Sequence, residues 1–208
     1  MLYLPPSFQR EWSWIPIGAV GFFLVCYISG AYLYPGGAKF NPASLGFSLI
    51  DNYWCDLFDS PTYGGQDNPA RPVALVGISV LSIGLMVLWW KLPAYFGSAR
   101  RGKALAIRSM GVLGAGLLPL VASPFHDSII NGTSLLLSGA ILLTLGILRQ
   151  QGKQQALYLG VAMMALVGIN LLVWKTGVGL LYLPLLQKIS FGFFLLWVIL
   201  VAQLTQKP

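Results

Sequence analysis

Apolar residues dominate the chain in six long stretches, and polar and charged residues gather between them. The stretches cover residues 14–34, 73–90, 109–125, 129–148, 156–174 and 180–204. A helix needs about 20 such residues to cross a hydrocarbon core of roughly 30 Å. The runs are too long and alternate too little for the strands of a membrane barrel. The pattern therefore predicts an all-α polytopic membrane protein, a six-transmembrane-helix bundle in which residues 1–208 form a single domain.

One span departs from this regular pattern. The third stretch, residues 109–125, is short and contains Pro119. Proline removes a backbone hydrogen-bond donor and clashes with the preceding turn, so a kink is expected near the end of this helix.

Composition supports a membrane location. The chain is 56% apolar and 9% charged, whereas a soluble domain carries about 25% charged residues. The net charge of +7 would suggest nucleic acid in a soluble protein. Here the basic residues flank the apolar stretches, so membrane topology explains them and nucleic acid is not an expected partner. Membrane lipids are the partner that the composition predicts.

The distribution of basic residues predicts an orientation. Nine lie in the terminal segments and in the second and fourth loops: Arg10, Lys91, Arg100, Arg101, Lys103, Arg108, Arg149, Lys153 and Lys207. The other three loops hold three: Lys39, Arg71 and Lys175. Basic loops stay in the cytoplasm, so we expect both termini to be cytoplasmic, in a bacterial inner membrane. Flanking tryptophans mark the expected interfaces: Trp12, Trp14, Trp89, Trp90 and Trp174.

The first loop, residues 35–72, is predicted to contain an amphipathic helix over residues 48–59. At 3.6 residues per turn, one face collects Ser48, Asp51, Asn52, Cys55, Asp56 and Asp59. The opposite face collects Ile50, Tyr53, Trp54, Leu57 and Phe58. Such a helix is expected to lie on or dip into the outer membrane surface, and Ser60-Pro61 would end it.

The outer loops also hold the candidate site. All five aspartates and the single histidine fall in the first and third loops, and Lys188 lies about 12 Å inside the sixth span at 1.5 Å per residue. A charge at that depth is costly unless it is paired. We expect an ion pair with Asp56, Asp59 or Asp127 at the floor of a polar, acidic pocket. The candidate ligand-binding residues are Asp51, Asp56, Asp59, His126, Asp127 and Lys188.

Simpler roles for the same residues stay open. Asp51, Asp56 and Asp59, on the polar face of the predicted helix, are equally compatible with a solvated acidic face that needs no partner. Asp127 or Ser128 is also a suitable cap for the fourth helix, and Lys188 is a candidate for a purely structural ion pair that holds the bundle together.

No cofactor is implied by the sequence. There is no phosphate-binding loop, no CxxC pair and no HExxH motif. His126 with the aspartates leaves divalent-metal binding open as a minority alternative, and no metal ligand is assigned. The two cysteines, Cys26 and Cys55, are expected to be free, because a bridge would require the first loop to fold back into the membrane.

Short motifs carry a resemblance to a known family. They are Tyr34-Pro35, the acidic segment 51–59 with Asp56-Leu57, Asn68-Pro69-Ala70-Arg71, and Pro124-Phe125-His126-Asp127. In this order the chain resembles the bacterial six-helix membrane family called domain of unknown function 998, which implies a fold and little chemistry. Its layout is also similar to the CREST group of membrane hydrolases. Those enzymes hold zinc with three histidines, and this chain has one.

Three classes of function remain. The favoured one is a membrane protein that binds a lipid or another small ligand at the extracytoplasmic pocket. The second is a lipid-acting enzyme, with His126 or an aspartate as general base and Lys188 as electrostatic stabiliser, so enzymatic activity stays undecided. The third is a proton or small-solute transporter, which the lack of a repeat between the two halves disfavours.

Overall fold

The computed structural model describes residues 12–95 and 101–205, and within them it contains six helices long and apolar enough to cross a membrane. They are α2 (Trp14–Leu33), α3 (Arg71–Tyr95), α4 (Arg101–Gly116) with the 3-10 helix η2 (Leu118–Ala122), α5 (His126–Gln150), α6 (Gln154–Thr176), and the 3-10 helix η3 (Leu180–Tyr182) with α7 (Leu183–Leu204). The predicted six-helix bundle is confirmed. The largest difference in its boundaries is that the third span begins at Arg101 rather than at residue 109.

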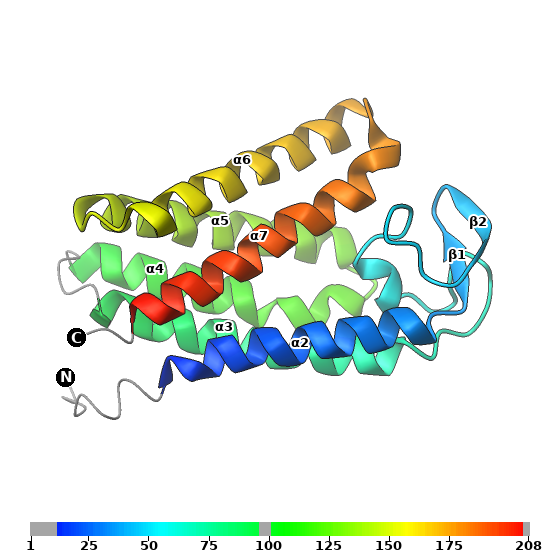
Figure 1. Cartoon of the computed structure of the whole chain (residues 1–208), viewed down its shortest axis with the longest axis horizontal. Helices are drawn as coiled ribbons and strands as arrows, with labels where there is room; N and C mark the ends of the chain where they lie inside the picture. The colour runs from blue at the N-terminus through cyan, green and yellow to red at the C-terminus, as the bar shows by residue number, and fades with distance from the viewer. Residues whose placement is uncertain (1–11, 96–100, 206–208) are drawn as a thin grey trace.

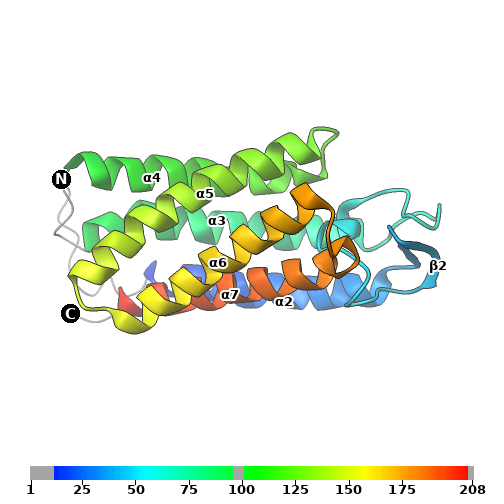
Figure 2. The same cartoon turned by 90° about the horizontal axis from the view of Figure 1, so that it is seen from above.

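The helices lie side by side, and consecutive ones pack against each other (Figure 1; Figure 2). The first turn of α2 and the last turn of α7 lie at one end of the bundle, and the loop between α2 and α3 covers the other, which we call the loop end. The third span changes from α-helix to 3-10 helix around Pro119, as a proline in this position leads one to expect. Arg10, Arg100 and Lys207 of the basic-residue pattern lie outside the described residues.

Two buried tryptophans pack against each other in the core of the bundle. Trp89 of α3 and Trp197 of α7 are both 0% exposed, and their ring centroids are 6.1 Å apart. Glycine lets neighbouring helices approach them, because a Cβ added at Gly111 would lie 2.3 Å from Cγ of Trp89. Trp89 therefore does not mark a lipid interface, contrary to the prediction for this residue. A bulky ring next to a facing glycine packs better in the core than at the surface.

Other aromatic residues near the helix ends do contact cations. The Lys91 ammonium lies 5.0 Å from a ring centroid of Trp12, and the Lys175 ammonium lies 4.5 Å from one of Trp174. Arg108 lies over Trp90 and donates to the Trp90 carbonyl oxygen at 2.9 Å. Indole rings paired with basic side chains are typical of the two boundaries of a lipid bilayer.

The first loop does not contain the predicted amphipathic helix. It forms an antiparallel hairpin of β1 (Gly36–Ala38) and β2 (Asn41–Leu45), then turns, and then the four-residue 3-10 helix η1 (Cys55–Phe58). Burial also does not follow the two predicted faces. The polar residues Asn52 and Asp56 are buried, whereas the apolar residue Ile50 is 57% exposed. The polar side chains bind backbone groups of the loop itself, and such bonds compete with helix formation.

Candidate functional site

A buried amide, Asn52, holds the parts of the first loop together. Its Nδ2 donates to the Gly37 carbonyl oxygen and to Oδ2 of Asp56, both at 2.8 Å. Its Oδ1 accepts from the Ser48 backbone N–H at 2.9 Å. One side chain thus links the hairpin, the following turn and η1, and none of its polar atoms is left without a partner.

Asp56 is the most buried of the predicted acidic residues, with 2% of its surface exposed. Its Oδ2 accepts from Asn52 and from the Tyr53 backbone N–H at 2.9 Å. Burial raises the pKa of Asp56 to about 6, and these two hydrogen bonds oppose the rise. The carboxyl group therefore has a structural role inside the loop.

A second buried amide, Asn68, was not among the candidate site residues predicted from the sequence. Its Nδ2 lies 2.7 Å from the Asp59 carbonyl oxygen, 3.3 Å from that of Asp56 and 3.2 Å from that of Leu57. Its Oδ1 accepts from the Ala70 N–H at 3.0 Å. The Asn68-Pro69 pair signals a turn, but sequence does not reveal that this side chain gathers the carbonyl groups around η1.

Lys188 of α7 reaches the first loop without forming the predicted ion pair. Its ammonium donates to the main-chain carbonyl oxygens of Asn52 and Pro184, the latter at 3.3 Å. It also lies 5.4 Å from the centroid of the Phe47 ring. The expected partners, Asp56, Asp59 and Asp127, are not its hydrogen-bond acceptors in the described part of the chain. Two carbonyl oxygens and the Phe47 ring surround the ammonium group and compensate its charge instead.

The remaining predicted residues lie at the edge of the same region. Asp51 accepts from the Ser48 hydroxyl at 2.7 Å, which closes a local turn. His126 begins α5, and its Nδ1 lies 2.7 Å from the Val121 carbonyl oxygen, so this nitrogen carries the proton. Asp127 is exposed in the first turn of α5. This is a favourable position for an acidic residue, but the expectation that Asp127 or Ser128 caps the helix is wrong. The N-cap residue is Phe125, and no side chain makes a capping hydrogen bond there.

Asp59 is exposed, and charges from two other segments act on it. Desolvation raises its pKa above the ordinary value, while the nearby charges of His126 and Arg71 oppose the rise. Among the described residues, no group of three or more His, Cys, Asp or Glu side chains could hold a metal ion.

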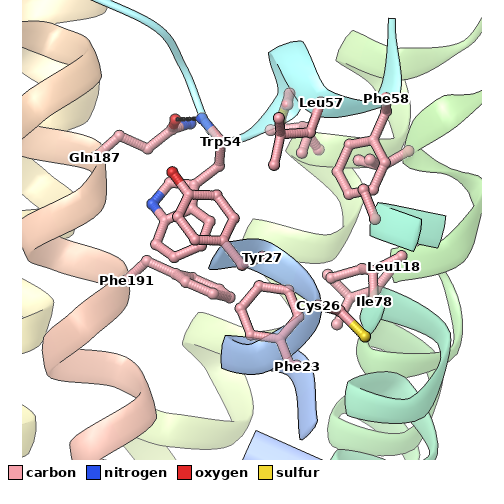
Figure 3. A pocket seen from close by; sticks show the side chains of 14 residues that line it. Phe23, Cys26, Tyr27, Trp54, Leu57, Phe58, Ile78, Leu118, Gln187 and Phe191 are labelled. Carbon is pink, nitrogen blue, oxygen red and sulfur yellow. Dashed lines mark hydrogen bonds between the residues drawn. The ribbon is translucent and has the colours of Figure 1, made fainter. Parts of the chain in front are cut away.

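An apolar cavity of about 120 Å³ lies beneath the first loop, at the loop end of the bundle (Figure 3). The residues that line it come from α2, η1 and its flank, α3, η2, α5 and α7: Phe23, Cys26, Tyr27, Trp54, Cys55, Leu57, Phe58, Ala74, Ile78, Leu118, Val121, Ile130, Gln187 and Phe191. None of the six predicted ligand-binding residues is among them. The lining of this cavity is thus aromatic and aliphatic rather than acidic.

Four aromatic rings form one wall of the cavity. The ring of Trp54 lies 3.7 Å from that of Tyr27, and the Phe191 ring lies 5.0 Å from Trp54 (Figure 3). Phe23 packs on Trp54 at 5.6 Å. Gln187, next to Lys188, accepts from the Trp54 backbone N–H at 3.3 Å. Adjacent residues of α7 therefore hold both the loop and its aromatic ring above the bundle.

Both cysteines line this cavity, and both are free. The expectation of free thiols is confirmed. The first loop packs on the loop end of the bundle and brings both cysteines to one cavity. Burial raises the pKa of Cys55 to about 12, and the charges of Asp56 and Asp59 add to the rise. A thiol of this kind is a poor nucleophile at neutral pH.

Searches of protein-family models, of curated proteins and of solved structures find no match to this chain. The resemblance to domain of unknown function 998 therefore stays a prediction. Sequence reasoning found the acidic loop and Lys188 but not the aromatic cavity beneath them. One usable signal was the spacing of Phe23 and Tyr27, which places both rings on one face of a helix.

Proposed function

We propose that this chain is a multi-pass protein of a bacterial cytoplasmic membrane that binds a small lipid-soluble ligand in the apolar cavity. Both termini would be cytoplasmic and the loop end extracytoplasmic. The basic residues support this orientation, because Lys91, Arg101, Lys103, Arg149 and Lys153 lie on helix ends or turns opposite the loop end.

The observation that carries the binding proposal is the cavity itself. A well-packed protein core has few voids larger than a water molecule. An apolar void of about 150 Å³ in another protein stays free of water and takes up benzene. The cavity of about 120 Å³ is slightly smaller, so it suits one ring or a short hydrocarbon segment.

The first loop would then form the lid of the cavity, and the six predicted residues would act mainly on this lid. Asp51, Asp56 and Lys188 hold the loop through the contacts described above, and Asp59, His126 and Asp127 border it. We infer that they shape access to the cavity from the extracytoplasmic side, while the aromatic residues beneath contact the ligand.

Binding of fluorobenzene to the purified protein, followed by ¹⁹F NMR, tests the proposal. Ala74→Leu should abolish the bound signal, because Ala74 lines the cavity and a larger side chain would fill it. Ala165→Leu is the matched control, since Ala165 is exposed on α6. Equal binding to the wild type and to Ala74→Leu would overturn the proposal, as would absence of binding to the wild type.

A further inference from the structure

One face of α5 carries polar side chains that the rest of the bundle leaves uncovered. Asn131 and Ser134 are exposed, and Ser138 is partly buried. At about 1.5 Å per residue, Asn131 lies about 8 Å and Ser138 about 18 Å from the start of the helix at His126. A polar group this far inside an apolar layer is out of reach of water, so it gains from a hydrogen-bond partner on a neighbouring helix.

These three side chains form no hydrogen bond with any other part of the chain that the structure describes. Polar side chains of other spans do. The hydroxyl groups of Ser79 and Thr144 donate to carbonyl oxygens of their own helices at 2.7 and 2.8 Å. The Asn170 amide of α6 donates across a helix interface to Oγ of Ser190 in α7 at 2.5 Å. The polar face of α5 therefore lacks the partners that similar groups find elsewhere in the bundle.

The uncovered face has the residue spacing of a helix–helix contact. Asn131, Leu135, Ser138 and Leu142 are separated by four, three and four residues, which is the alternation that keeps one side of a helix against a partner helix. Leu135 and Leu142 are 74% and 56% exposed. We call these four residues the α5 seam.

The neighbours of α5 occupy other sides of the helix. Leu136 faces α4, because a Cβ added at Gly114 would lie 3.1 Å from the Leu136 Cβ. α6 covers α5 mainly in the half next to their connecting turn, since the buried residues of α6 are Ala156, Gly160 and Met163. Beyond them α6 runs away from α5 toward the loop end (Figure 1). The α5 seam is therefore open along the half of the helix that holds the polar groups.

The depth of these groups indicates what covers them. Hydrocarbon chains have no hydrogen-bonding groups, and lipid headgroups lie at the interface. A second copy of this chain, inserted in the same direction and related by a two-fold axis along the membrane normal, presents the same residues at the same depth. Amide and hydroxyl groups both donate and accept, so the seam is complementary to itself.

We propose that the α5 seam is a dimer interface, at which α5 packs against α5 of a second copy. The two leucines supply apolar contact, and Asn131 and Ser138 form hydrogen bonds between the two helices. Asn131 fixes the register of the pair, as a single polar seam residue does in coiled coils. This interface is separate from the cavity, so the inference requires that the helices span a membrane but not that the cavity binds a ligand.

Disulfide cross-linking in native membranes tests the geometry. Leu135→Cys, Ser138→Cys and Leu142→Cys each place a thiol on the seam, and a disulfide forms where two Cα atoms lie about 4–7 Å apart. Mild oxidation should convert the variants nearest the helix crossing to covalent dimers. Leu136→Cys is the matched control on the same helix and should stay monomeric, because Leu136 faces Gly114 of α4.

The wild type serves as the blank, since its own cysteines, Cys26 and Cys55, line the cavity. Covalent dimers from seam variants, with none from Leu136→Cys or the wild type, would support the proposal. Failure of all three seam variants to cross-link, or equal cross-linking of Leu136→Cys, would overturn it.

Asn131→Leu tests the polar contact separately. Leucine suits a position that faces lipid, so the variant should fold, and its thermal unfolding checks this. Dimerisation is measured in vesicles of phosphatidylethanolamine and phosphatidylglycerol by energy transfer between copies labelled at Lys153→Cys, an exposed position. The dissociation constant of the dimer should rise about tenfold. Ser29→Leu, a similar change at an exposed position of α2, should leave it unaltered. An unchanged constant in Asn131→Leu would overturn the proposal.

Discussion

The Lys188 ammonium donates a hydrogen bond to the main-chain carbonyl oxygen of Asn52, 136 residues earlier in the chain. This contact joins the start of the last span to the centre of the first loop. Asn52 in turn bonds Gly37 and Asp56 through its side chain. One charged side chain of α7 is thereby connected to the first loop, and its hydrogen-bond acceptors among the described residues are carbonyl oxygens rather than carboxylates.

Lys188→Met should loosen the first loop. The variant keeps the length of the side chain but leaves the Asn52 carbonyl oxygen without this donor. A hydrogen bond from a charged group contributes about 1.5–3 kcal/mol, so proteolysis of residues 35–70 through local opening should accelerate about tenfold or more. Lys175→Met is the control, since Lys175 is exposed at the end of α6. Equal cleavage rates in the wild type and in Lys188→Met would contradict this role.

Asn68→Asp should be one of the most damaging isosteric changes in the loop. It replaces an amide that donates to the carbonyl oxygens around η1 with a carboxylate that would repel them. We expect the free energy of unfolding to fall by about 2–3 kcal/mol, measured by unfolding in detergent. Asn41→Asp introduces the same change at an exposed position of β2 and should have little effect. A similar loss in both variants would show that added charge, rather than the lost donor, is responsible.

Asp56 should make stability depend on pH between about 4 and 6. Its pKa is raised from 3.8 to about 6, so over this interval the folded protein keeps a proton that the unfolded chain releases. Stability from this group is therefore greatest below the unfolded pKa, and it falls by about 3 kcal/mol as the pH rises through 6. The variant Asp56→Asn should remove most of this dependence, because an amide oxygen can accept the same two hydrogen bonds.

The measurement for Asp56→Asn is the unfolding midpoint across pH 4 to 7. Asp67→Asn changes an exposed residue of the same loop and should retain the pH dependence of the wild type. A wild-type midpoint that rises with pH over this range would contradict the direction predicted for Asp56.

The six helices could be predicted from the sequence because one strong physical requirement determines them. Backbone groups in an apolar stretch of this length have to bond locally, and the apolar runs are long. The loop could not be predicted in the same way. Its period-3.6 pattern over residues 48–59 is present, but the side chains of Ser48, Asn52 and Asp56 bond backbone groups in turns. The sequence shows such residues without showing which backbone groups they will meet.

The sequence indicated the region of the candidate site but not the contacts within it or its apolar cavity. Lys188 reaches the first loop, and the charges of Asp56, Asp59, Asp127 and Lys188 all act on Cys55, but a role of these residues in binding stays a prediction. The partner of Lys188 is a main-chain carbonyl oxygen. Every residue has such a group, so the sequence does not show which one Lys188 contacts. Trp54 was assigned to a membrane-facing surface, whereas its ring packs on Tyr27 inside the structure.

Labelling of cysteines tests both the burial of the native thiols and the orientation of the chain. Burial raises the pKa of Cys55 to about 12, so its thiol stays protonated at pH 7.5 and reacts slowly. Cys26 is buried in α2. The folded wild-type protein should therefore resist maleimide, and the denatured protein should react at both cysteines. Rapid labelling of the folded wild type would contradict the closed packing of the loop over the bundle.

In this unreactive background, two exposed positions report the two ends of the bundle. Asp67→Cys lies in the first loop and Lys153→Cys in the turn before α6. A membrane-impermeant maleimide should label Asp67→Cys in intact cells, and Lys153→Cys only after the membrane is permeabilised. The opposite result would place the basic turns outside the cytoplasm, against the rule that basic loops are retained there. It would also make the cavity accessible from the cytoplasmic rather than the extracytoplasmic side.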